Sequence, residues 1–276
     1  MRRVLVLVAG NLLLIAVAVF ATARAMKPPP PLPSPPPDPQ AAVNAYYVAH
    51  YLDEVDQVAH HAEPHSSNAL EEAIIRDFFH DKQGGTFVDI GANHFKNASN
   101  TYYLETKLGW SGLAVDALDE FKDGWAKNRP KTKFFTAFIA DKGDAEETIY
   151  VAKDAMQVSS SNRAFTEDEE GAKSEPRKVP TLTLNQLLAR EKVEHFDLLS
   201  MDIELTEPKA LAGFDIEKYR PGLVCIEAHK SVRQAILDYF AAHHYVLVGR
   251  YLKVDPMNLY FEPLGDPTGP REGHQQ

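Results

Sequence analysis

Two apolar segments in the second half of this 276-residue chain end in acidic and histidine side chains. Asp202 and Glu204 follow FDLLSM, and Glu227 and His229 end GLVCIEAH. A carboxylate or an imidazole can remove a proton from an alcohol, so we take Asp202 first and His229 second as a candidate base. The same four side chains could instead hold a divalent cation that acidifies a hydroxyl group, or Glu204 and Glu227 could only bond to each other.

Three earlier apolar segments also end in acids. TFVDIGAN carries Asp89, Gly91 and Asn93, GLAVDA carries Asp116, and Asp141 follows KFFTAFIA. A glycine at such a place permits a tight turn, and an acid after a second strand can bind a ribose diol. The first turn is not a dinucleotide fingerprint, and carboxylates repel phosphate. The three acids therefore favour a cofactor with adenosine and no phosphate, such as S-adenosyl-L-methionine, although single acids at strand ends are common surface residues.

Alternating strand and helix patterns position both groups of residues. Apolar runs predict buried parallel strands at 86–92, 112–117, 133–140, 196–204 and 222–229, and helical spacing predicts helices at 67–80, 99–108, 119–128, 184–190 and 232–243. Residues 148–154 look extended, and 159–178 are polar without periodicity, which predicts a flexible loop or lid. The pattern indicates an α/β fold with a doubly wound Rossmann-like sheet that binds ligands at the carboxyl ends of its strands.

The overall composition excludes several classes of protein. The formal net charge is -10 and the isoelectric point is near 5.6, so the chain has no general attraction to phosphate backbones and nucleic acid is not an expected partner. The single cysteine, Cys225, excludes a disulfide within the chain and a cysteine-based zinc site. Its place inside an apolar strand indicates an inert core residue.

The N-terminus has a different character from the rest of the chain. Residues 4–22 are almost uninterruptedly apolar, long enough to just span a membrane, yet a signal peptide with a cleavage site near Ala23 or Ala25 fits equally well. About half of the chain's 19 prolines follow, and they predict an extended spacer. We expect a membrane-associated protein with a single-pass N-terminal anchor, or a secreted or periplasmic protein after signal cleavage. The flanking charges leave the orientation open.

An ordered set of motifs resembles the FkbM-type S-adenosylmethionine-dependent methyltransferases. The motifs are FVDIGAN, Ser99–Tyr102 with Leu104-Glu105, GWSGLAVDA, VPTLTLNQLL, DLLSMDIELTE and LVCIEAH, and they span roughly residues 85–261. The resemblance implies a mostly parallel sheet whose last strand is antiparallel, and methyl transfer to a hydroxyl oxygen. It implies that cofactor-binding residues are those of the first three strand ends together with the Ser99–Tyr102 motif, namely Asp89, Gly91, Asn93, Asn100, Asp116 and Asp141.

Two positions depart from the family pattern. Asp116 stands where relatives more often have glutamate, so the shorter acid must sit closer to its ligand. Leu205 stands where relatives have glycine; if that turn needs a positive φ, leucine costs about 1–2 kcal/mol there.

These observations lead to one favoured function and two alternatives. We predict an S-adenosylmethionine-dependent O-methyltransferase that acts on a hydroxyl of a glycan, lipid-linked sugar or small metabolite, with a divalent cation open but not favoured. The alternatives are a non-catalytic tethered or exported binding protein on the same fold, and another Rossmann-type enzyme such as an NAD-dependent oxidoreductase. The predicted organisation is an anchor or signal (1–25), a proline-rich linker (26–42), a helical extension (43–84), the methyltransferase domain (85–265) and a disordered tail (266–276).

Overall fold

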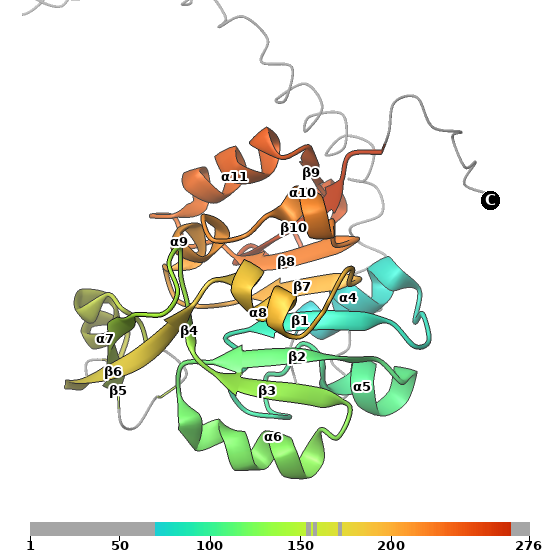
Figure 1. Ribbon diagram of the computed structural model, residues 1–276. Coiled ribbons are helices and arrows are strands. Elements are labelled where there is room, and N and C mark those ends of the chain that lie inside the picture. The colour runs from blue at the N-terminus through green and yellow to red at the C-terminus, as the bar shows by residue number, and fades with distance from the viewer. Residues whose placement is uncertain (1–69, 153–155, 157–158, 171–172, 266–276) are drawn as a thin grey trace, which may run out of the picture. The chain divides into compact units, whose positions relative to one another are not determined.

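The computed structural model describes residues 70–152, 156, 159–170 and 173–265 (Figure 1). The predicted N-terminal hydrophobic helix, the proline-rich linker, the first part of the helical extension and the C-terminal tail lie outside these residues. Within them, no helix combines the length and the apolar character that a membrane span requires.

Seven strands form the central sheet in the order β3-β2-β1-β7-β8-β10-β9. The strands are β1 (Thr86–Ile90), β2 (Ser111–Asp116), β3 (Thr132–Thr136), β7 (Leu198–Met201), β8 (Leu223–Glu227), β9 (Tyr245–Leu247) and β10 (Asn258–Pro263). Only β10 runs against its neighbours, because it pairs antiparallel with both β8 and β9. The expectation of a mostly parallel sheet with an antiparallel last strand is confirmed. Because β1, β2, β7 and β8 are parallel, their carboxyl ends lie along one edge.

Helices cover both faces of the sheet and bury two cores (Figure 1). One face carries α4 (Leu70–Phe79), α5 (Tyr102–Leu108) and α6 (Lys122–Asn128), which follows the short 3-10 helix η2 (Asp119–Phe121). The other carries α8 (Leu184–Arg190), α9 (Glu207–Leu211), α10 (Ile216–Tyr219) and α11 (Arg233–Ala242), and η4 (Gly249–Tyr251) precedes β10. Successive residues of β1 point to opposite faces of the sheet and so pack into different cores. Phe87 packs with Ile74 and Leu104, whereas Val88 packs with Leu187.

Two sequence predictions fail in the region between β3 and α8. The expected strand 133–140 ends at Thr136, and the chain then leaves the main sheet as β4 (Phe138–Ile139). The expected flexible loop 159–178 instead contains α7 (Arg163–Glu170) and most of β6 (Ser174–Leu182). β6 pairs through residues 174–180 with β5 (Glu146–Ala152) and through its last two residues with β4, in a second, three-stranded sheet. These polar residues form a strand because a distant partner satisfies their backbone groups.

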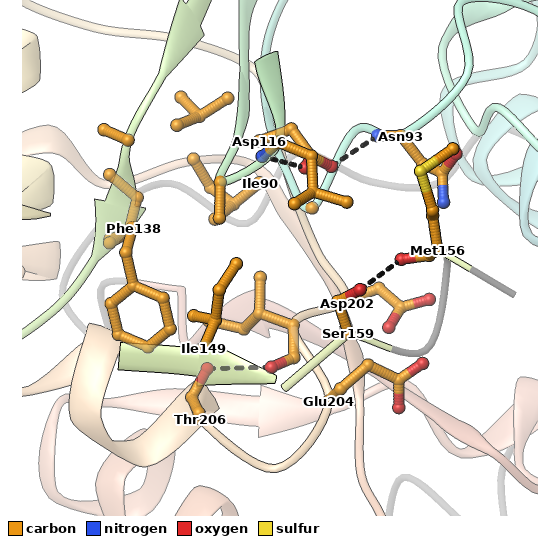
Figure 2. A pocket seen from close by; sticks show the side chains of 17 residues that line it. Ile90, Asn93, Asp116, Phe138, Ile149, Met156, Ser159, Asp202, Glu204 and Thr206 are labelled. Carbon is orange, nitrogen blue, oxygen red and sulfur yellow. Dashed lines mark hydrogen bonds between the residues drawn. The ribbon is translucent and has the colours of Figure 1, made fainter. Parts of the chain in front are cut away.

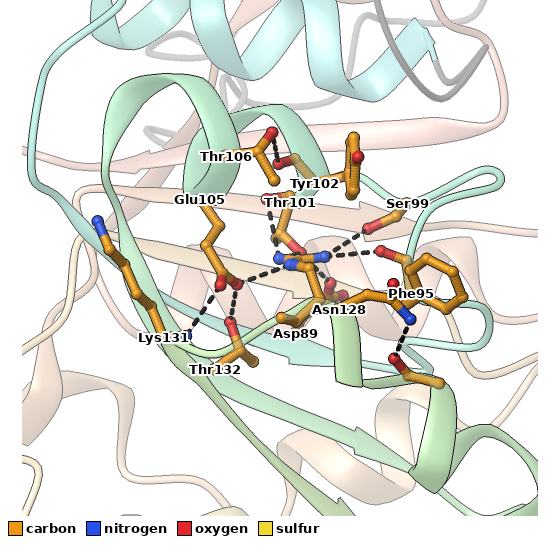
Figure 3. Close-up of polar contacts among 12 residues, drawn as sticks. Asp89, Phe95, Ser99, Thr101, Tyr102, Glu105, Thr106, Asn128, Lys131 and Thr132 are labelled. Atoms are coloured by element: carbon orange, nitrogen blue, oxygen red, sulfur yellow. Dashed lines mark hydrogen bonds and ion pairs between the residues drawn. The ribbon is translucent and has the colours of Figure 1, made fainter. Parts of the chain in front are cut away.

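A buried arginine fastens the segment after β1 to the adjacent helices (Figure 3). Arg129 is fully buried, and its Nε lies 2.6 Å from Oε2 of Glu105 on α5. Its other nitrogens donate to the carbonyl oxygens of Phe95 and Thr101 at 3.0 Å. Thr101 in turn donates its hydroxyl to Asp89 at 2.8 Å. One guanidinium group therefore connects α5, the end of α6 and two points of the loop that follows β1.

Replacing this arginine should weaken the fold strongly. We expect Arg129→Ala to lower the free energy of unfolding by about 3–5 kcal/mol, because Glu105 is then left charged and buried without its partner. Adding Glu105→Gln in the same chain should recover part of the loss by removing that charge. Chemical denaturation measures all three, with the exposed Lys127→Ala on the same helix as control, expected within about 0.5 kcal/mol of the wild type. A single mutant as stable as the control would contradict the role of the network.

Candidate active site

The backbones of Gly91, which follows β1, and Asp202, which follows β7, are in close contact. Gly91 has φ 81°, and a Cβ atom built on it would lie 1.7 Å from the carbonyl oxygen of Asp202. Only glycine fits both this backbone conformation and this contact. The turn after β1 and the turn after β7 therefore stand side by side, which brings the two groups of predicted residues together.

A pocket opens at this edge, where the turns after β1, β2 and β7 meet (Figure 2). Its polar lining includes three predicted cofactor residues and two predicted catalytic residues, which are Gly91, Asn93, Asp116, Asp202 and Glu204. Apolar side chains form the rest of the wall, with Ile90 and Val115 from the main sheet and Phe138 and Ile149 from the second sheet. The pocket thus combines an apolar slot with polar groups at its edges, as small-molecule sites generally do.

Asp116 joins the two turns that frame the pocket. One carboxylate oxygen accepts a hydrogen bond from the backbone N–H of Asn93 at 2.9 Å, and the other accepts from the N–H of Leu118 at 2.8 Å. Burial raises the pKa of Asp116 to about 6, although the two hydrogen bonds stabilise the ionised carboxylate and act to lower the pKa. Each oxygen keeps a second lone pair, so the carboxylate can accept two hydroxyl groups from the pocket.

The structure does not bring the other three predicted cofactor residues to the pocket wall. Asp89 is buried and accepts from Thr101 in the arginine network, and burial raises its pKa to about 6. Asn100 donates to the hydroxyl of Ser200 at 3.0 Å. Asp141 is exposed. The side chain of Asp89 points to the opposite side of the sheet from Val88 and Ile90, because successive residues of a strand alternate between faces.

The four predicted catalytic residues converge beside the pocket. His229 Nε2 lies 3.1 Å from Glu227 Oε1 and 3.5 Å from Glu204 Oε2, and the carboxyl groups of Asp202 and Glu227 are hydrogen-bonded. Asp202 and Glu204 also line the pocket, so the cluster and the pocket are continuous. One ligand atom each from Glu204, Glu227 and His229 lies within 4.8 Å of the others, a spacing that would also suit a metal ion.

Asp202 and Glu227 lie in the same environment, and the protonation of one carboxyl group affects that of the other. Burial raises the pKa of both, to about 6 for Asp202 and much further for Glu227, whose neighbours Asp202 and Glu204 add like-charge repulsion. Two carboxyl groups in hydrogen-bond contact cannot both ionise easily, so they hold one proton between them at neutral pH. Asp202 is the more exposed of the two, and Glu227 also faces Glu204, so the negative charge is more favourable on Asp202 and the shared proton on Glu227.

A strained turn delivers Glu204 to the cluster. Glu204 and Leu205 have φ values of 53° and 74°, so the turn does need the left-handed conformation that the sequence analysis questioned. Glu207, which is fully buried, accepts from the N–H of Ile203 at 3.1 Å, and burial raises its pKa to about 7. Thr206 closes the turn by donating its hydroxyl to the Ile203 carbonyl. The turn keeps its shape with leucine because the side chains of Thr206 and Glu207, which follow it, both bind the backbone of Ile203.

Several lining residues were not predicted. Phe138, Ile149, Met156 and Ser159 all come from the region of β4 and β5, and Phe165 on α7 packs against His229. Phe138 and Ile149 were expected in extended segments, and Ser159 and Phe165 in a flexible loop. The local sequence of these segments gives no signal that they return to the carboxyl edge of the main sheet.

A comparison with protein families identifies the domain to which these residues belong. The model of the methyltransferase FkbM domain matches residues 89–247. No curated protein matches the chain. Among solved structures, a TehB-like SAM-dependent methyltransferase from Corynebacterium glutamicum is 12% identical, with 80% of this chain and 100% of that chain covered and a TM-score of 0.42. An O-methyltransferase from Bacillus cereus in complex with SAH is 13% identical, with 80% and 96% covered and a TM-score of 0.39.

Relief of the strained turn should stabilise the protein. We expect Leu205→Gly to raise the free energy of unfolding by about 1 kcal/mol. The left-handed conformation costs leucine about 1–2 kcal/mol and glycine almost nothing, and the greater entropy of glycine in the unfolded chain offsets part of this gain. Thermal or urea denaturation measures the change. The control is Leu237→Gly in the interior of α11, which should destabilise the protein. Loss of stability in both variants would show that the turn stores no strain.

Proposed function

Because the chain belongs to the FkbM methyltransferase family, whose domain model covers more than half of it, we propose that it is an O-methyltransferase. The donor is S-adenosyl-L-methionine, and the acceptor is a hydroxyl group of a glycan, a lipid-linked sugar or a small metabolite. The observation that carries the proposal is the continuity of the pocket with the cluster of Asp202, Glu204, Glu227 and His229. Family membership removes the NAD-dependent oxidoreductase from consideration.

The pocket residues suit an adenosyl cofactor. The Asp116 carboxylate would accept the ribose hydroxyls, and the apolar wall of Val115, Phe138 and Ile149 would cover a flat aromatic base. The pocket has no phosphate-binding glycine loop, and its carboxylates favour a positively charged group over an anion. Asp202 and Glu204 stand where the pocket meets the cluster, so a cationic sulfur would lie near negative charge.

The chemistry is a displacement at one carbon atom. S-adenosyl-L-methionine supplies a methyl group on a positively charged sulfur; the acceptor oxygen forms a bond to that carbon while the carbon–sulfur bond breaks, which leaves a neutral thioether. The hydroxyl proton must pass to a base on the protein. Correct positioning of the two reactants contributes much of the rate in such a reaction.

Asp202 is the base that the contacts favour. It is the ionised member of its pair, and it lines the pocket directly. His229 faces Glu227 and Glu204 with Nε2, so that nitrogen is already engaged. Glu227, which carries the shared proton, would orient Asp202 rather than accept a further proton. The proposal includes no divalent cation, and chelation with EDTA should leave turnover unchanged.

We also propose that the N-terminal hydrophobic segment tethers the domain to a membrane, with an exported protein as the alternative. This proposal rests on the sequence of residues 1–25. The remaining functional alternative is a non-catalytic binding protein, which would bind the cofactor but transfer no methyl group to any acceptor.

Titration calorimetry of the full chain with S-adenosylhomocysteine tests the cofactor site. Micromolar binding is expected, and the absence of binding to folded protein would refute the proposal. Incubation with S-adenosylmethionine carrying a ¹³C-labelled methyl group, together with a panel of alcohols and amines, tests the type of transfer. Label found on oxygen by NMR supports O-methylation, whereas label found only on nitrogen refutes it.

The affinity for S-adenosylhomocysteine should depend on pH through Asp116. The carboxylate takes up a proton below about pH 6 and then accepts hydroxyl groups less well, so binding should weaken as the pH falls from 7.5 to 5. Asp116→Asn should bind about 10–100-fold more weakly at pH 7.5 and lose most of this pH dependence. The exposed Asp119→Asn is the matched control. An unchanged pH profile in Asp116→Asn would assign the dependence to another group.

The two members of the shared-proton pair should respond differently to amide substitution. Asp202→Asn should lower turnover about 100-fold or more, because it removes the base. Glu227→Gln should lower it only a few-fold, because the amide resembles the protonated acid that Glu227 already is at neutral pH. Both should bind S-adenosylhomocysteine as the wild type does, measured by calorimetry. Equal losses of turnover in the two variants would overturn the assignment of Asp202 as the base.

A further inference from the structure

The imidazole of His94 folds the loop that follows β1. Its Nδ1 accepts hydrogen bonds from the backbone N–H groups of Lys96 at 3.1 Å and of Asn97 at 2.9 Å. A side chain that accepts from the backbone a few residues further along closes a tight turn, as asparagine and aspartate side chains do. His94 follows directly after Asn93, which lines the pocket. The turn closed by the imidazole therefore adjoins the cofactor site.

These contacts define the tautomer of the ring. A ring nitrogen that accepts from two N–H groups carries no proton, so the proton of the neutral His94 imidazole lies on Nε2. His195, which precedes β7, has the opposite arrangement, because its Nδ1 lies 3.2 Å from the carbonyl oxygen of Tyr219 and must donate to it. The chain thus contains a natural reference for the assignment.

The residue after His94 holds the ring in place. The imidazole stacks on the ring of Phe95, with ring centres 4.3 Å apart and planes inclined by 29°. Phe95 packs closely against α6, where a Cβ atom on Gly124 would lie 2.9 Å from its ring. The carbonyl oxygen of Phe95 accepts from Arg129 at 3.0 Å. The imidazole therefore rests on an anchored neighbour while its Nδ1 binds the backbone.

Asn93 connects this turn with the pocket. Its φ is 44°, a conformation that residues other than glycine keep only where their surroundings impose it. Its N–H donates to Asp116 at 2.9 Å (Figure 2), and its carbonyl oxygen accepts from Trp125 Nε1 at 2.8 Å. Ala98 also has a positive φ, of 53°. The two bonds to His94 thus lie within a segment that has a left-handed residue at each end.

Loss of the acceptor on His94 would loosen this segment. Lys96 and Asn97 are exposed, so water can replace the imidazole at their N–H groups and the hydrophobic cores are unaffected. Asn93 could then leave the left-handed conformation, and its N–H would no longer orient the Asp116 carboxylate. The effect would fall on the pocket rather than on global stability.

We propose that His94 is a positioning residue for the cofactor. With its proton on Nε2, the imidazole holds Asn93, and through the Asn93 N–H it holds Asp116, in the arrangement that accepts the ribose hydroxyls. The inference rests on the proposed function, because it assumes that the pocket binds S-adenosylmethionine.

Three substitutions distinguish an acceptor at Nδ1 from the other properties of the ring. Asparagine places its Oδ1 where Nδ1 of histidine lies, glutamine places its Oε1 near the position of Nε2, and alanine has no acceptor. Titration calorimetry of the full chain at pH 7.5 should show S-adenosylhomocysteine binding about 10-fold more weakly to His94→Ala and His94→Gln than to the wild type. His94→Asn should bind within about threefold of the wild type.

The matched control is His195→Ala, which removes the exposed histidine bonded to Tyr219 and should leave the affinity unchanged. Chemical denaturation should give the His94 variants the same unfolding midpoint as the wild type. Long-range ¹H–¹⁵N NMR spectra of the histidine rings test the contact without a ligand. His94, assigned by its absence in His94→Asn, should be in the Nε2–H tautomer, and His195 should be in the Nδ1–H tautomer.

The possible failures are distinguishable. If the wild type binds S-adenosylhomocysteine and His94→Ala binds it equally well, the inference is overturned while the methyltransferase proposal stands. The same holds if His94→Asn binds no better than His94→Gln, or if His94 is in the Nδ1–H tautomer. If the folded wild type does not bind S-adenosylhomocysteine, the proposed function fails and the inference fails with it.

Discussion

The contact between Gly91 and the carbonyl oxygen of Asp202 is the constraint on which the site depends. A Cβ atom has no room there, so the turns after β1 and β7 approach more closely than any other residue would allow. That approach brings the pocket and the acid cluster together, because Asp202 and Glu204 belong to both. The loop after β1 has positive φ values at both Gly91 and Asn93 while it frames the pocket. Such a backbone needs support from its surroundings, and the buried Arg129 network supplies it through the carbonyl oxygens of Phe95 and Thr101.

The site concentrates acids at a cost to the fold. Asp89 and Asp116 have pKa values raised from 3.8 to about 6 by burial, so the folded chain binds their protons more tightly than the unfolded chain does. Their ionisation therefore lowers stability as the pH rises from roughly 4 to 6. The fold retains these charges because their hydrogen bonds fix backbone turns: Asp116 holds Asn93 and Leu118, and Asp89 holds Thr101.

The second sheet gives the site its far wall. Its strands add Phe138 and Ile149 to the pocket, and α7 adds Phe165 to the cluster. The main sheet alone would offer an open edge with acids along it. The added wall encloses that edge and supplies apolar surface beside the carboxylates, a combination that is typical of small-molecule sites.

The sequence by itself determined most of the strands and helices of the main sheet, the resemblance to the family, and the convergence of Asp202, Glu204, Glu227 and His229. These follow from local signals, because apolar runs fix parallel strands and parallel strands bring their carboxyl ends to one edge. Only the tertiary structure decided which acids face the pocket: Asp116 does, whereas Asp89 turns into the arginine network and Asp141 is exposed. It alone also showed that the polar residues after Ser159 form α7 and the first part of β6, and that α7 contacts the site through Phe165. Both outcomes depend on pairing between residues far apart in the chain, which no local pattern encodes.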